Sequence, residues 1–262
     1  MNDFLNEINA IPVIDSHHHL RSHDQCQPYD SVIDFVTYAS YLICLLPHAD
    51  RALAAKVQDK TLDERVRWNY FLQLWPFVRC TGFGQTIVRI LRFWKLGEEL
   101  NDVSFEAMHD FLQSQSPEKS REAYLQVGIE RSITHFLGHP VCGGLENVKD
   151  YLEGRLAFDS AFYPLLGTLP LHEYFDRSGI ETVGCVSGMA ITSLADLTRA
   201  INEIAERTIK KGAIGFKDHA AYSRGLAFGA PDKLAAEQEF GCLMAGEHFE
   251  HGARNLSDYL FW

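Results

Sequence analysis

The stretch VIDSHHHL, residues 13–20, joins a short apolar strand to three consecutive histidines and carries the strongest signal in the chain. Side chains alternate between the two faces of a strand, so Asp15, His17 and His19 share one face. The α-carbons of His17 and His19 would then lie about 6–7 Å apart, and both imidazoles could reach one metal ion. The spacing predicts that these two histidines bind a divalent metal, with zinc as the first expectation. His18 is expected to face a helical layer instead.

A His-x-His pair is weak evidence when it stands alone, because histidines are common in solvated loops. Here the pair ends an apolar strand, which is where an α/β barrel places its chemistry. That placement favours a metal site over a solvated loop.

Composition describes an acidic globular protein. The chain has 262 residues, 46% of them hydrophobic and 23% charged, and a formal net charge of −11. Without a basic patch to neutralise phosphates, no nucleic-acid partner is expected. The start, MNDFLNEI, is acidic where a secretory signal would be basic, and the apolar stretch 35–46 is too short to cross a bilayer. We therefore predict a soluble cytoplasmic protein without a membrane partner, and a buried helix at 35–46.

The cysteines indicate neither a zinc motif nor a redox motif. There are six, and no two form a Cys-x-x-Cys pair. Widely separated cysteines in a chain without a secretion signal are most often reduced core residues. We expect buried thiols at Cys26, Cys44, Cys80, Cys142, Cys185 and Cys242.

Strand and helix patterns alternate along most of the chain. Short apolar runs predict strands at 11–17, 131–136, 162–168 and 213–219, with a weaker candidate at 182–188. Helical periodicity covers about 30–126, and a second helix runs from the cap Ser193 to the stop signal Gly212. The alternation predicts an α/β fold with a parallel sheet of about four βα units. A helical insertion would follow the first strand, within one domain spanning 1–262.

The strand at 213–219 offers a second chemical signal. Lys217 and His219 share one face at its carboxyl end, as would suit the mouth of a barrel. The alternative is that Lys217 extends to solvent and His219 is an ordinary loop residue. Spacing alone leaves both interpretations open.

Several segments resemble a known superfamily. VIDSHHHL resembles the first-strand Asp-x-His-x-His signature of the amidohydrolase superfamily, and GAIGFKDHAAYSRGL, residues 212–226, resembles the fourth-strand region of its amidohydrolase-related, family 2 branch. WPFVRCTGFGQTIVRILRFWKLGEEL, residues 75–100, and CVSGMAITSLADL, residues 185–197, are similar to the subset with a uronate-isomerase-like helical insertion. The similarity extends over about 13–260.

The resemblance implies a (β/α)8 TIM barrel with a divalent metal at its carboxyl-terminal mouth. It implies a hydrolase in which metal-activated water attacks an amide, ester or related bond of a small-molecule substrate. Lys217 matches a position where some members carry a carboxylated, metal-bridging lysine. The candidate residues are His17, His19 and Lys217 as metal ligands, with His219, Tyr222 and Arg224 as substrate contacts.

The chain departs from the superfamily pattern in one respect. Members draw an acid, which is also a metal ligand, from the last strand of the barrel, but this sequence has room for about four βα units. The catalytic acid is therefore unknown, and the chain is expected to be the amino-terminal part of a barrel with open sheet edges. Two alternatives remain: a uronate-isomerase-like isomerase, and a non-catalytic remnant that self-associates through those edges.

Overall fold

The computed structural model describes residues 7–8, 10–22, 31–39 and 41–262, and these fall into two compact units. The first, which we call the barrel unit, comprises Met1–Gln25 and Ser120–Trp262 and contains all the described strands. The second, the helical unit, comprises Cys26–Lys119. Each unit has its own hydrophobic core.

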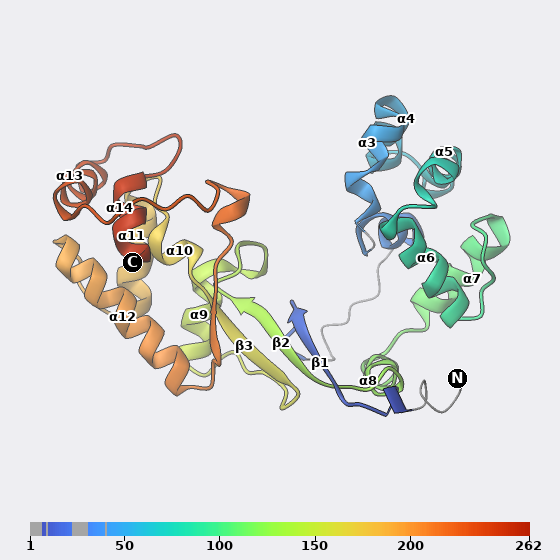
Figure 1. Cartoon of the computed structure of the whole chain (residues 1–262), viewed down its shortest axis with the longest axis horizontal. Helices are drawn as coiled ribbons and strands as arrows, with labels where there is room; N and C mark the ends of the chain where they lie inside the picture. Colours follow the sequence, from blue (N-terminus) through green and yellow to red (C-terminus); the bar gives the residue numbers. More distant parts are fainter. Residues whose placement is uncertain (1–6, 9, 23–30, 40) are drawn as a thin grey trace. The chain divides into compact units, whose positions relative to one another are not determined.

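The barrel unit is built on a parallel sheet of four strands (Figure 1). Its strands are β1 Val13–His18, β2 Ile129–Leu137, β3 Phe162–Gly167 and β4 Gly215–Lys217. They pair in chain order, so β1 and β4 form the two edges. The predicted α/β class is confirmed, and the sheet has the form of half an eight-stranded barrel.

Helices cover one face of this sheet. Leu137 and Leu166, from β2 and β3, pack against apolar side chains of the helices that follow each strand. In the long helix α12, buried residues recur every three or four positions, and Ser193 caps its first turn as the sequence predicts. The helical elements of this unit after β2 are η4 Pro140–Cys142, α9 Gly144–Leu152, α10 Leu169–His172, α11 Arg177–Ser187, α12 Leu194–Lys210, η5 Ala220–Tyr222, α13 Lys233–Met244 and α14 Arg254–Phe261.

The weaker strand candidate at 182–188 is wrong. It lies in helix α11, Arg177–Ser187. Ile180 and Val183 are both buried and one turn apart, which is a helical spacing, and Gly188 ends the helix with φ of 75°. The short apolar run alone did not distinguish a strand from the buried stripe of a helix.

The helical unit is organised around aromatic side chains. Trp68, Phe71 and Leu74 of α5 are completely buried. Beside them the buried Arg67 pairs with Asp34, at 2.5 Å between Nη2 and Oδ1. The elements between β1 and β2 are α2 Val32–Asp34, η2 Phe35–Ala39, η3 Leu42–Cys44, α3 Leu46–Ala49, α4 Arg51–Gln58, α5 Glu64–Val78, α6 Gly82–Phe93, α7 Asp102–Gln113 and α8 Pro117–Gln126.

The apolar stretch 35–46 is not the single helix we predicted. It divides into a π-helical, a 3₁₀ and an α-helical segment, and Tyr41 has a positive φ of 58° at the break. Ser40 lies outside the described residues. Leu42 and Leu46 are nevertheless completely buried. In the part of the chain that the structure describes, no single helix meets the length and hydropathy test for a membrane span, although the bent pair Val32–Tyr38 and Leu42–Ala49 meets it jointly.

The prediction of buried cysteines is also wrong where it can be compared. The five described cysteines are free thiols, but Cys44, Cys80 and Cys185 are exposed, and Cys142 and Cys242 are half-buried. Cys26 lies outside the described residues. Cys185 and Cys242 lie on helices α11 and α13, whose buried positions are occupied mainly by apolar side chains such as Ile180 and Phe240.

Candidate metal centre

Histidines from three neighbouring regions of the barrel unit gather where strands β1, β2 and β4 end. The carboxyl ends of parallel strands meet at one edge of a sheet, so side chains far apart in sequence come together there. We call this group the histidine centre; its members are His17, His19, His135, His139 and His219, with Lys217 beside them.

The two histidines of the opening motif lie side by side, with 3.1 Å between their Nε2 atoms. The Nδ1 atom of His19 lies 3.0 Å from the backbone oxygen of His135, which can only accept a hydrogen bond. The proton of neutral His19 is therefore on Nδ1, and Nε2 carries the lone pair, for which an ion would compete with Nε2 of His17. Histidines that bind metals commonly donate their other N–H to a backbone carbonyl in this way.

His18 lies apart from the centre. Its Nε2 atom hydrogen-bonds to the hydroxyl of Tyr124 on α8, and its ring also contacts Phe162. A register shift between Asp15 and His18 interrupts the pairing of β1 with β2. Such irregularities re-aim side chains next to functional sites.

Two members of the histidine centre, His135 and His139, were missed by sequence reasoning. One ligand atom each from His19, His135 and His139 lies within 4.8 Å of the others, close enough to share one ion. His135 is the second-to-last residue of the strand predicted at 131–136, and His139 follows four residues later, just after the strand; this spacing was the available signal. At His139, Nδ1 also accepts a hydrogen bond from the backbone of Val141 (3.2 Å), so an ion would compete for that lone pair.

His219 joins the centre from β4 and was expected to contact substrate. Its ring centroid lies 4.0 Å from that of His135 and 5.1 Å from that of His139. Among the described atoms, the ring nitrogens of His135 and His219 are buried without a hydrogen-bond partner. Buried polar atoms without partners are costly, and an ion bound between these rings would satisfy one nitrogen of each. The donor set therefore fits a divalent metal.

The surroundings lower the pKa of imidazoles in the centre. Burial, and next the neighbouring His219, lower the pKa of His135 to about 3. Burial, and next His19, lower the pKa of His139 to about 4. Burial first and Lys217 second lower the pKa of His17 as well. At neutral pH these three rings therefore carry the lone pairs that metal binding requires.

Lys217 lies against His17, with its Nζ atom 3.1 and 3.2 Å from the two ring nitrogens. The side chain is half-buried, and this desolvation lowers the pKa of Lys217. The structure thus brings Lys217 to the first of the predicted ligands.

The other two predicted substrate contacts lie differently. Tyr222 is 91% exposed, with its ring 6.3 Å from that of His219. The side chain of Arg224 is buried in an ion pair with Asp258 (2.5 Å), and its Nη1 donates to Ser257 (2.7 Å). The structure does not bring this guanidinium to the histidine centre, because a buried charge requires a partner and Asp258 provides it.

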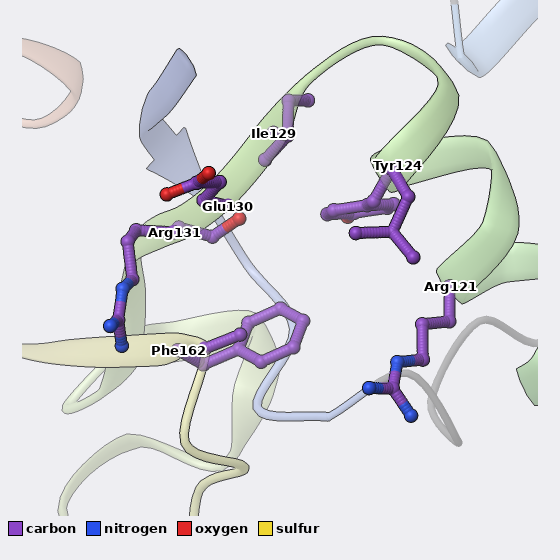
Figure 2. A pocket seen from close by; sticks show the side chains of 9 residues that line it. Arg121, Tyr124, Ile129, Glu130, Arg131 and Phe162 are labelled. Carbon is purple, nitrogen blue, oxygen red and sulfur yellow. The ribbon is translucent and has the colours of Figure 1, made fainter. Parts of the chain in front are cut away.

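A small cavity of about 120 Å³ lies elsewhere in the barrel unit. Figure 2 shows Arg121 and Tyr124 of α8 facing Phe162 and the first residues of β2, Ile129 to Arg131. This is the amino-terminal end of the strands, opposite to the end where barrels place their chemistry. We assign it no role in the centre.

Gly167 of β3 leaves room for the ring of His135. A Cβ atom added at Gly167 would lie 2.7 Å from His135 Nε2 and 2.9 Å from the oxygen of Gly138. We expect Gly167→Ala to lower the free energy of unfolding by about 1–3 kcal/mol, because the neighbours must shift. Urea unfolding followed by circular dichroism measures this.

Gly241→Ala is the matched control. It lies in helix α13, and nothing stands within 4 Å of an added Cβ atom. Alanine is favoured over glycine inside a helix, so this variant should be no less stable than the unaltered chain. Equal stability of the two variants would contradict the steric argument.

Known proteins resemble the chain in fold rather than in sequence. No protein-family model and no curated protein matches it. Among solved structures, a uronate isomerase from Thermotoga maritima superposes with a TM-score of 0.70 at 14% identity, covering 98% of this chain and 56% of that one. Glucuronate isomerase from Caulobacter crescentus gives 0.62 at 14%, covering 97% and 54%. A uronate isomerase from Bacillus halodurans C-125 gives 0.55 at 17%, covering 80% and 50%.

These likenesses correct one expectation. The three solved structures are isomerases, so the prediction of a metal-dependent hydrolase is wrong in its reaction type, and the isomerase alternative is favoured. At such identities the likeness shows the fold alone, which is that of a partial TIM barrel. The chain spans about half the length of these structures.

Proposed function

We propose that this chain forms the metal-binding part of an aldose–ketose isomerase that acts on a sugar acid of the uronate type. The observation that carries the proposal is the coincidence of two features. The fold is that of uronate and glucuronate isomerases over nearly the whole chain. The histidine centre lies at the carboxyl ends of the strands, where barrel enzymes hold their substrates.

Zinc is the ion we propose for the centre, since neutral imidazoles suit it. His19 and His135 would hold it, with His139 and His219 as the remaining donors within reach. A bound divalent ion would supply polarisation of the sugar's carbonyl oxygen.

The chain's own residues can provide proton transfer and substrate binding. In the isomerisation a proton leaves C2 and one is delivered to C1, while the hydroxyl proton passes from the C2 oxygen to the C1 oxygen. The neutral imidazole of His17 can accept and return such a proton. Lys217, a donor beside it, can bind the carboxylate of the sugar acid.

The test is conversion of D-glucuronate by the zinc-loaded chain in heavy water, followed by ¹³C NMR. We expect a ketose product that carries deuterium at C1, and its loss in His17→Ala. D-glucose, which lacks the carboxylate, is the matched control and should react much more slowly. Absence of ketose from the zinc-loaded chain would overturn the proposal.

We also propose that the open edges of the sheet pair with a second copy of the chain. On edge strand β1, Val13 and Ile14 are 41% and 61% exposed, and on β4 Phe216 is 56% exposed. Exposed apolar edge strands are templates for pairing with another chain.

Ile14→Lys tests this pairing. Light scattering should give twice 29.7 kDa for the unaltered chain and 29.7 kDa for the variant, because charge on an edge strand opposes pairing. Leu234→Lys on α13, where the leucine is 67% exposed, is the control and should stay a dimer. A monomeric unaltered chain would refute the proposal.

A further inference from the structure

A continuous network of hydrogen-bonded side chains, buried or half-buried, connects Asp218, which follows β4, to the helices α10 and α14. Asp218 Oδ2 lies 2.5 Å from His172 Nε2, and His172 Nδ1 lies 3.1 Å from Ser257 Oγ. Ser257 in turn accepts from Arg224 Nη1 at 2.7 Å, and Arg224 pairs with Asp258. His172 and Ser257 are 3% and 2% exposed. These hydrogen bonds thus join the end of β4 to α10 and α14.

The directions of these bonds are mutually consistent. A carboxylate only accepts, so His172 donates its proton from Nε2 to Asp218. In the neutral ring Nδ1 accepts from the hydroxyl of Ser257, whose oxygen is left to accept from Arg224. In this tautomer of His172 each of these bonds has a donor and an acceptor, although Nε of Arg224 is buried without a partner among the described atoms. Consecutive hydrogen bonds between buried groups favour one arrangement of the residues they join.

Asp218 stands between two residues of the histidine centre. Its neighbours in sequence contact the centre itself: Lys217 lies against His17, and His219 lies against His135. Besides His172, Asp218 accepts hydrogen bonds from Thr168 Oγ1 (2.7 Å) and from the backbone of Ala220 (2.6 Å). Burial acts to raise the pKa of Asp218, but the hydrogen bonds from His172 and its other donors outweigh it and lower the pKa.

The β4 strand is poorly anchored without this residue. It has three residues, Gly215–Lys217, and among the described strands it pairs with β3 alone, which leaves its other edge without a neighbouring strand there. A strand this short supplies few ladder hydrogen bonds. The orientation of His219, which follows it, therefore depends on what holds Asp218.

We propose that Asp218 and His172 are positioning residues that hold His219 in the histidine centre through the hydrogen-bonded chain to α14. This inference rests on the proposed metal site, and it adds that residues on the far side of β4 set the metal affinity. When a residue that orients a metal ligand through a hydrogen bond is replaced, the metal affinity typically falls 10- to 100-fold.

Two substitutions of one buried residue test it. In His172→Gln the amide nitrogen can take the place of Nε2 and keep the donor to Asp218. In His172→Asn the amide can take the place of Nδ1, which keeps a group near Ser257 and loses the bond to Asp218. Both variants remove the same ring, so their cost to folding is similar.

Zinc affinity is measured by competition with a chromophoric chelator, and the thermal midpoint of the metal-free chain is recorded alongside. We expect His172→Asn and Asp218→Ala to bind zinc at least 10-fold more weakly than the unaltered chain, and His172→Gln to stay within about threefold of it. Equal affinities of the two His172 variants, whatever their thermal midpoints, would overturn the inference and leave the metal site standing.

A measurement without metal separates this inference from the proposed function. In the metal-free chain, the imidazole ¹⁵N signals of His219 should move in His172→Asn and stay in place in His172→Gln. If the unaltered chain binds no zinc, the metal site fails, while these signals still decide whether Asp218 and His172 position His219. Unmoved signals in both variants would refute the positioning role.

Discussion

Replacing His135 with alanine is expected to lower the affinity of the chain for zinc at least 100-fold. His135 is 1% exposed, and its ring lies within 6 Å of the rings of His19, His139 and His219, at centroid distances of 5.9, 4.9 and 4.0 Å. The ring of His139 also contacts three of these rings, but His135 is the more buried of the two, and neither of its ring nitrogens has a partner among the described residues. Loss of a metal ligand should lower the affinity by more than the 10- to 100-fold that is typical when a residue hydrogen-bonded to a ligand is removed.

The measurement is zinc bound per chain after dialysis, followed by chelator competition. His251→Ala is the matched control, since His251 is exposed and lies outside the histidine centre in the same unit. That variant should bind like the unaltered chain. If His135→Ala retained the full affinity while His17→Ala lost it, the ion would belong to the β1 pair and Lys217 instead.

The metal-free chain is expected to lose stability as the pH falls from 6.5 toward about 3. Burial lowers the pKa of His135 to about 3, whereas its ordinary value is 6.5. Between these two pH values His135 is protonated in the unfolded chain and neutral in the folded chain, so acid favours unfolding. Above pH 6.5 both states are neutral at this residue and it contributes no pH dependence. Over the whole window His135 alone accounts for a loss of about 5 kcal/mol.

Urea unfolding at pH 7, 5 and 4 tests this, with His135→Gln as the comparison because glutamine does not titrate. The carboxylates also respond to acid, so the quantity to follow is the difference in unfolding free energy between the two chains. As the pH falls, the unaltered chain should lose more unfolding free energy than His135→Gln does. A difference that stays constant from pH 7 to 4 would show that His135 is protonated freely in the folded chain. His139, with a pKa lowered to about 4, adds in the same direction and is present in both chains.

Much of the fold could be predicted because its signals are local. A short apolar run predicts a strand, as at β1 and β3. The residues that begin and end helix α12 lie within a few positions of its ends. The failures were local as well. The run at 182–188 satisfied a strand pattern and a helix pattern equally, and packing of Ile180 and Val183 in the core decided for the helix.

The candidate site was predictable only in part. His17 and His19 share a strand, so period-two alternation sufficed to pair them. The ion-pair and hydrogen-bond partners of Arg224 could not be predicted from a local pattern of this kind. Its ion pair with Asp258 spans 34 positions, and nothing near Arg224 in the sequence indicates that its charge is satisfied inside the barrel unit.

The sequence by itself determined that this is an α/β chain with parallel strands and a pair of histidines at the end of the first. Only the tertiary structure decided which other residues join them. His19 and His135 are 116 positions apart and meet because β1 and β2 lie side by side with their carboxyl ends together. His219 arrives from the far edge of the same sheet. Alternation along one strand is a property of the local backbone, whereas adjacency between strands depends on how the whole apolar core packs.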